Sequence, residues 1–117
     1  MLDKDTILSI SETRIPHEVV VDEWGGSVFV RSLSGRELDC LMADWRRLGA
    51  EDGKNAGRVL ACVVAATACD ETGELIFENS DIDKLHTLPV AGVKLVAEAA
   101  LEFNGLTEEM QETIEGN

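Results

Sequence analysis

The sequence has little positive charge and few aromatic side chains, and both shortages narrow its possible functions. Its 117 residues include 10 Lys and Arg against 23 Asp and Glu, so the formal net charge is -13 at neutral pH. Such a chain repels nucleic-acid phosphates and anionic membranes, which disfavours DNA or RNA binding unless the protein mimics a nucleic acid. Tyrosine is absent and aromatics make up 4% of the chain, so any exposed ring is a candidate contact residue.

Long apolar runs and paired cysteines are also missing. No apolar run approaches the ~20 residues of a membrane span, and the start MLDKDTILSI lacks the apolar core of a signal peptide. The three cysteines, Cys40, Cys62 and Cys69, are odd in number and have no CxxC spacing. We therefore expect buried free thiols in a reducing cytoplasm, and neither a disulfide framework nor a metal framework.

Motifs for catalysis and ligand binding are absent as well. The sequence contains no GxSxG elbow, no P-loop and no GxGxxG. Asp70–Glu74 resembles the start of a calcium loop, but Leu75 and Asp81 stand where that loop needs Gly and Glu. His86 lies near Asp81 and Asp83, a pattern more typical of a surface histidine beside cap-region acids than of a metal site. We expect no enzyme, no cofactor and no metal.

The segment from Glu18 to Glu37 organises the chain and predicts a β-hairpin followed by a capped helix. The β-branched runs Val19–Asp22 and Val28–Ser32 flank Gly25-Gly26, which suit the centre of a tight two-residue turn. The resulting register pairs Val21 with Val30 and divides the apolar side chains between two faces: Val19, Val21, Val28 and Val30 on one, and Val20, Trp24 and Phe29 on the other. A lone hairpin is marginally stable, so at least one face must pack on the helices. The domain itself, another copy or a partner can cover the second face.

Helical patterns fill most of the remaining chain. Ser34 and Glu37 have capping-box spacing, and an apolar stripe follows, ending at Gly49: Leu38, Leu41, Met42, Trp45 and Leu48. Ala56–Cys69 is apolar nearly all round and predicts a central buried helix, with a strand as the alternative for residues 63–69.

Further signals divide the second half of the chain. Leu75–Phe77 predicts a short strand or an extended segment. Ser80 caps one helix, and Pro89 lies in the first turn of another, which ends at Asn104-Gly105. Thr107 caps a last helix over Glu108–Glu115. The fold class is α+β: a mainly helical single domain with an N-terminal β-hairpin packed on a helical bundle.

Two parts of the chain carry apolar side chains beyond the needs of a core. Residues 1–15 form a candidate N-terminal arm, for which a short helix is the alternative, and residues 16–117 form the domain. Trp24 at the hairpin tip either folds back onto the helices or stays exposed. We expect contacts with other proteins at five positions: Val20, Trp24, Phe29, Leu2 and Ile7.

Several short motifs together resemble a known family. They are Glu23-Trp24-Gly25-Gly26, Val28, Val30-Arg31, Leu33, Ser34-Gly35-Arg36-Glu37, the Asp70–Gly73 turn, Phe77, the Ser80-Asp81 helix start and the Ala100–Leu106 ending. This pattern resembles the tail assembly chaperones of long-tailed (lambda-like and related siphophage) bacteriophages, over about residues 16–107.

The resemblance implies a non-enzymatic protein of virion morphogenesis in the host bacterial cytoplasm, absent from the mature virion. It implies binding to the tape measure and tail tube proteins and self-association into a homo-oligomer. From the acidic charge we expect no nucleic acid and no membrane partner. Programmed frameshifting in this family implies a possible longer form.

Two other classes compete with this interpretation. One is an acidic nucleic-acid mimic that inhibits a host DNA-binding protein, since residues 59–117 carry most of the negative charge; the other is a small enzyme or metal protein.

Overall fold

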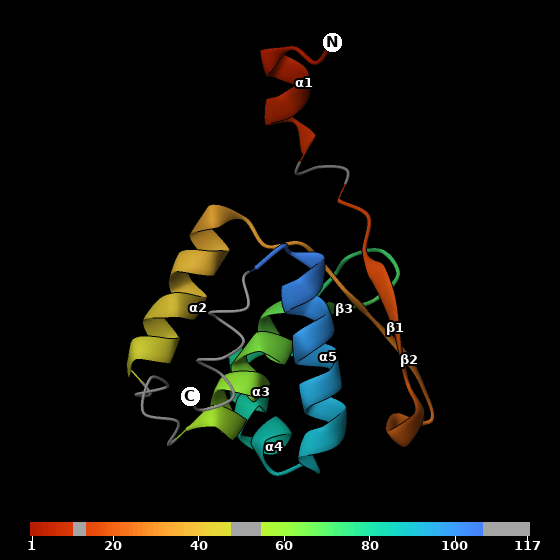
Figure 1. Ribbon diagram of the computed structural model, residues 1–117, viewed down its shortest axis with the longest axis vertical. Coiled ribbons are helices and arrows are strands. Elements are labelled where there is room, and N and C mark those ends of the chain that lie inside the picture. Colours follow the sequence, from red (N-terminus) through yellow and green to blue (C-terminus); the bar gives the residue numbers. More distant parts are fainter. Residues whose placement is uncertain (11–13, 48–54, 107–117) are drawn as a thin grey trace.

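The hairpin lies along one side of a group of helices in the computed structural model (Figure 1), which describes residues 1–10, 14–47 and 55–106. Strands β1 (His17–Val21) and β2 (Gly26–Val30) are antiparallel, and β3 (Ala68–Cys69) pairs with the other edge of β2. Helix α5 (Val90–Phe103) packs on β1 and β2, and α3 (Ala56–Thr67) packs behind it. The α+β class and the packing of the hairpin on helices are as predicted.

The turn of the hairpin is longer than the sequence predicts. Asp22–Trp24 form a 3-10 turn, η2, and Gly25 closes it with φ 74°. Only one of the two glycines is therefore used for a left-handed conformation, and Gly26 instead begins β2 opposite Val21. The predicted pairing of Val21 with Val30 is wrong.

The predicted division of the two faces survives this error. Val21 pairs with Gly26 instead of Val30, a shift of four residues, and an even shift leaves the strand side chains on their predicted faces. Trp24 is the exception: it lies in η2, outside both strands, and its indole lies against α5 instead of sharing the second face with Val20 and Phe29. All four valines of the predicted core face are buried: Val19, Val21, Val28 and Val30.

Helix α2 (Gly35–Arg47) begins at the predicted capping box. The Glu37 N–H donates to Ser34 Oγ at 3.1 Å, and the Ser34 N–H donates to Glu37 Oε1 at 2.8 Å. Leu41 and Trp45, from the apolar stripe, are buried. Leu48 and the predicted cap Gly49 lie outside the described residues.

Helix α3 is the central helix of the fold, and it resolves the alternatives for residues 63–69. The helix continues through Thr67, and only Ala68-Cys69 is strand. Thr67 is buried, and its hydroxyl donates to the Val63 carbonyl at 2.7 Å, so this polar group is satisfied inside the helix. The adjacent Thr67 carbonyl accepts from the Arg31 N–H at 3.0 Å, which joins the end of α3 to β2.

The segment between β3 and α5 contains two short helices, η4 (Asn79–Asp81) and α4 (Ile82–His86). Their cap is a correction to the sequence prediction: Glu78 and Asp81 form a capping box, and Ser80 lies inside the turn. Asn104 follows α5, as predicted, whereas Pro89 is the N-cap that precedes the helix and not a residue of its first turn. Leu75–Phe77, predicted as a short strand or an extended segment, makes one bridge between Leu75 and Cys69 and is not a named strand. The predicted helix Glu108–Glu115 and its cap Thr107 lie outside the described residues.

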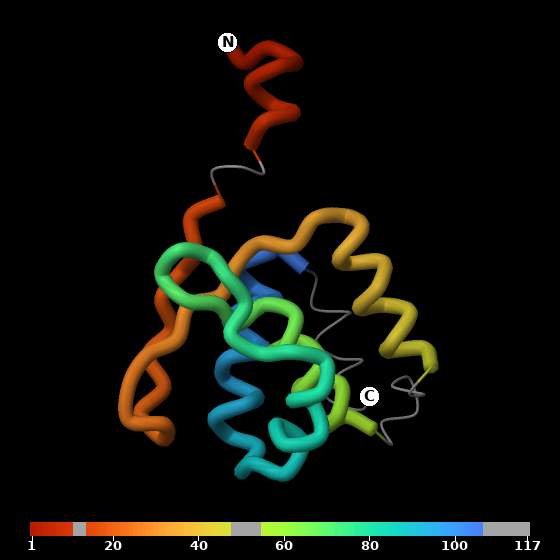
Figure 2. The backbone as a smooth tube through the Cα atoms, turned by 180° about the vertical axis from the view of Figure 1, so that it is seen from behind, coloured from red at the N-terminus to blue at the C-terminus, as the bar shows by residue number. Residues whose placement is uncertain are grey.

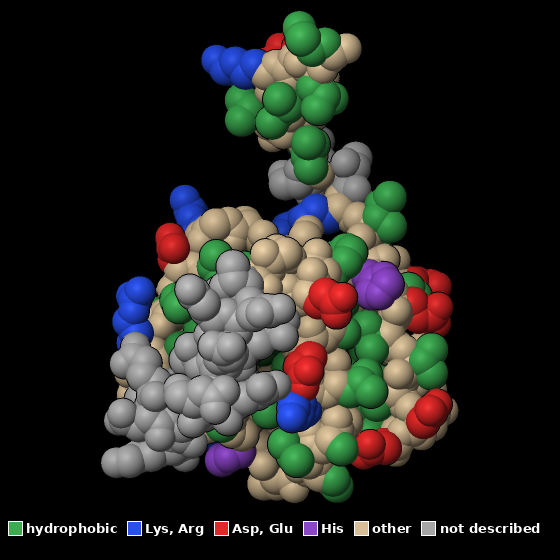
Figure 3. All heavy atoms as spheres, viewed as in Figure 1, with side chains coloured by type: hydrophobic (Ala, Val, Ile, Leu, Met, Phe, Trp, Pro, Cys, Tyr) green, Lys and Arg blue, Asp and Glu red, His purple; other side chains and the backbone are tan. Residues whose placement is uncertain are grey.

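The N-terminal residues form a short helix, α1 (Lys4–Leu8), which stands off from the other elements in both views (Figures 1 and 2). Asp3 caps this helix by accepting the Thr6 N–H at 2.8 Å. None of its residues is buried. Its apolar side chains gather into a patch at this end of the molecule (Figure 3).

Candidate protein-interaction surface

The five predicted contact residues fall into two groups, one on the arm before β1 and one spread along the hairpin from Phe29, which pairs with Glu18, to Trp24 at the turn. Leu2 and Ile7, with exposed fractions of 64% and 49%, belong to the arm before β1. Val20, Trp24 and Phe29 belong to the hairpin, where Val20 is 63% exposed and Phe29 is half-buried. The structure does not bring the two groups together within one chain.

Trp24 combines the two alternatives that the sequence leaves open. Its indole lies against α5 so closely that a Cβ at Gly92 would be 2.5 Å from Nε1. The residue nevertheless stays 38% exposed. Trp24 therefore anchors the hairpin tip to the helices and still offers an apolar face to solvent.

Beside Trp24 lies an apolar groove that sequence reasoning missed. We call it the tip groove; its volume is about 310 Å³ and its walls are Glu23, Trp24, Phe77, Leu85, Leu88 and Pro89. A second hollow of about 340 Å³ shares Phe77, Leu85 and Leu88 with it and adds Ile76, Asp81 and Lys84. The hairpin tip, the segment before α4 and the turn before α5 each contribute a wall. No single stretch of sequence carries this pattern.

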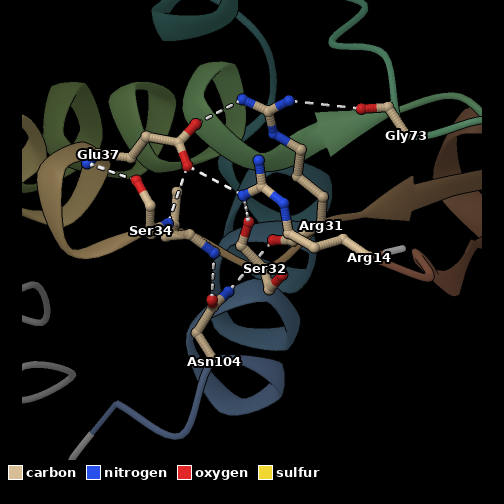
Figure 4. Close-up of polar contacts among 8 residues, drawn as sticks. Arg14, Arg31, Ser32, Ser34, Glu37, Gly73 and Asn104 are labelled. Carbon is tan, nitrogen blue, oxygen red and sulfur yellow. Dashed lines mark hydrogen bonds and ion pairs between the residues drawn. The ribbon is translucent and has the colours of Figure 1, made fainter. Parts of the chain in front are cut away.

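A polar network fixes the opposite end of the hairpin (Figure 4). Glu37 accepts from Arg14 at 3.1 Å and from Arg31 at 2.7 Å, in addition to its capping bond. Arg14 also donates to the Ser32 carbonyl at 2.8 Å. The root of the arm, the end of β2 and the start of α2 therefore meet at one carboxylate.

The ionisation of Glu37 reflects this setting. Partial burial alone would raise the pKa of its carboxyl, but the hydrogen bonds from Ser34 and Arg14 and the charge of Arg31 outweigh it. The net effect holds the pKa of Glu37 below its ordinary value, so the charged form that binds both arginines is favoured.

Asn104 extends the network to the end of α5. Its Oδ1 accepts from the Leu33 N–H at 2.6 Å, and its Nδ2 donates to the carbonyls of Ala100 at 2.8 Å and Arg31 at 3.3 Å. The sequence predicts Asn104 only as a helix end, whereas the structure also gives it partners more than 70 residues away.

The cysteines correct one expectation. Cys62 and Cys69 are buried, and burial is the main cause that raises the pKa of each thiol. Cys40 is exposed on α2, so the prediction of three buried thiols is wrong at this position. Its place on the helix is off the buried stripe of Leu41 and Trp45.

Several carboxylates serve turns and caps. Asp70 accepts from the N–H groups of Thr72 at 2.8 Å and Glu74 at 3.1 Å, and the hydrogen bonds from Thr72 are foremost in lowering the pKa of Asp70.

Across residues 1–10, 14–47 and 55–106, no three potential metal ligands cluster together. No helix in these same ranges has the length and apolar character to cross a bilayer.

Comparisons with known proteins give one informative similarity. No protein-family model matches the sequence, and no curated protein sequence matches it. Among solved structures, the tail assembly chaperone of bacteriophage HK97 is similar over 85% of this chain and 97% of its own length, with a TM-score of 0.57 and 19% sequence identity. The chain therefore has the fold of a phage tail assembly chaperone, the family that its sequence motifs resemble.

Proposed function

We propose that this chain is a phage tail assembly chaperone that binds the tape measure and tail tube proteins during tail morphogenesis. The observation that carries the proposal is the similarity to the HK97 chaperone, which extends over 85% of the chain. In this role the protein acts in the host cytoplasm, associates with itself and is left out of the finished virion. The role requires no catalysis and no cofactor.

The surface of the chain supports a holding function. Apolar side chains on the arm and around the hairpin can cover exposed apolar segments of a client protein that would otherwise aggregate. The net charge of -13 keeps a complex dispersed while those segments are covered. The carboxylates with described hydrogen bonds serve turns, caps, ion pairs and one cross-strand bond from Ser27 to Glu18, and these local roles do not favour the nucleic-acid mimic.

The proposed contact residues remain Val20, Trp24, Phe29, Leu2 and Ile7. Val20 is the cleanest to test, because its side chain is 63% exposed and its removal leaves the core face intact. Leu95 on α5, 44% exposed, is a suitable control at a different surface.

Co-expression with the tape measure protein tests the proposal. The unsubstituted chain should keep the tape measure protein in the soluble fraction and co-purify with it. Val20→Ser should weaken that binding about tenfold if this residue contributes ~1.4 kcal/mol to the interface, and Leu95→Ser should leave it unchanged. A tape measure protein that aggregates equally with and without the chain would overturn the proposed function.

A further inference from the structure

Helix α1 and the residues on either side of it carry apolar side chains that stay exposed to solvent. Leu2, Ile7, Leu8 and Ile10 are between 49% and 71% exposed. A helix of five residues is far below the ~12–15 residues at which isolated helices are even marginal in water. Packing against another surface would both bury these side chains and stabilise the helix.

The tip groove is a surface of matching character. Its walls are mainly apolar, and its volume of about 310 Å³ is at the low end of the ~300–1,000 Å³ found for small-molecule sites. Leu88 and Trp24 remain 42% and 38% exposed on its walls. A few aliphatic side chains from a single helical turn suit such an open hollow.

The direction of the chain favours a groove on a second copy. The arm leads into the start of β1, at the end away from the hairpin turn (Figure 1). Trp24 and the tip groove lie past the other end of β1, at the turn. β1 has five residues, about 17 Å of extended chain. To reach its own groove the arm would have to reverse and run back along the whole hairpin. A second copy can present its groove to the arm without that reversal.

Charge favours the arm as the part that approaches. Two domains from a chain of net charge -13 repel each other, but residues 1–10 contribute only Lys4 against Asp3 and Asp5. The tip groove has one charged wall residue, Glu23, and the second hollow beside it carries both signs, Asp81 and Lys84. Lys4 can therefore face an acidic wall while Asp5 faces Lys84, with little net repulsion.

We propose that α1 of one copy of this chain seats in the tip groove of a second copy, with Ile7 against Leu88. The proposal deepens the proposed function, on which it rests for the use of Leu2, Ile7 and Trp24 as contact residues. It names the partner of the arm as the chain itself.

Disulfide trapping between two full-length chains tests this contact. Cys40, the exposed native thiol, is replaced by Ser in both chains. One chain then carries Ile7→Cys and the other, distinguished by a tag, carries Leu88→Cys. After mixing and mild oxidation, the cross-linked heterodimer should form several-fold faster than with the control Ile15→Cys, which is 83% exposed but lies outside α1. Equal rates for the two positions would overturn the proposal.

A single chain carrying both Ile7→Cys and Leu88→Cys separates the two possible geometries. At high dilution it should stay unlinked, and an efficient internal cross-link would overturn the assignment to a second copy. In the native sequence, Ile7→Ser should lower the mass measured by light scattering, and Ile15→Ser should not. A mass unchanged by Ile7→Ser in a folded chain also counts against the contact.

These measurements use the purified chain without a client. If the cross-link fails while the tape measure protein is still held in solution, only the arm-to-groove contact is wrong. If the cross-link forms but no client is held, the proposed chaperone function is wrong and the self-association stands.

Discussion

The indole of Trp24 lies against the backbone of Gly92, and together they join the hairpin tip to the first turn of α5. A Cβ at residue 92 would be 2.5 Å from Nε1 and 2.9 Å from Cε2 of the ring. The ring therefore leaves no room for a side chain at residue 92. Backbone conformation is not the reason for glycine here, since Gly92 lies in α5 and does not have a positive φ angle.

This contact predicts that the sign of a Gly92→Ala effect depends on Trp24. In the native chain, the added methyl group should displace the indole and destabilise the fold by about 1–3 kcal/mol, as other overpacking substitutions do. In a Trp24→Ala background the same change should be neutral or stabilising by up to about 1 kcal/mol, since alanine is the better helix former. Urea unfolding of the four chains measures both values.

Tryptophan fluorescence gives an independent control for this cycle. Trp45 is 2% exposed, so its emission should stay constant, whereas emission from Trp24 should shift to longer wavelength in Gly92→Ala. The same destabilisation with and without the Trp24 ring would contradict the proposed contact.

Features written locally in the sequence are predicted well. The capping box of Ser34 and Glu37 depends on residues three apart, and the structure contains both of its hydrogen bonds. The buried face of the hairpin depends only on alternation, so Val19 and Val28 are placed correctly even though the turn is not.

Features that depend on distant parts of the chain are not predicted. The turn at Asp22–Gly25 leaves Trp24 beside Gly92, and no local pattern links these residues. The tip groove likewise needs Phe77 and Leu88 to meet the hairpin tip. A local rule also failed at the start of η4: Ser80 is a good cap residue, but Glu78 with Asp81 caps that helix start instead.

Glu37 predicts a loss of stability on acidification. The folded state lowers the pKa of Glu37, so its contribution is complete above the ordinary glutamate pKa of about 4.3 and is lost as pH falls through the lowered folded value. Glu37→Gln should therefore lower the melting temperature at pH 7, by roughly 4 °C if the bonds contribute about 1 kcal/mol. Near pH 3 the difference from the native chain should shrink.

Scanning calorimetry between pH 3 and 7 follows this difference. Glu71→Gln is the matched control, because Glu71 is an exposed residue of the turn after β3 and lies outside the Glu37 network. A Glu37→Gln penalty that is equally large at both ends of the pH range would show that the side chain acts through packing and not through its charge.

The hydrogen bonds of the Asn104 side chain predict that Asn104→Ala lowers the stability of the fold. Replacing it by alanine removes the acceptor of the part-buried Leu33 N–H and the donor to the Arg31 carbonyl, both far away in sequence. Leaving such groups unpaired costs about 1–3 kcal/mol, so the midpoint of urea unfolding should fall while its slope is retained. Asn79→Ala, in the exposed turn η4, controls for the loss of an asparagine that has no such long-range bond in the described structure. Equal effects at the two positions would mean that water replaces Asn104 without cost and that the end of α5 is held to β2 by its apolar contacts alone.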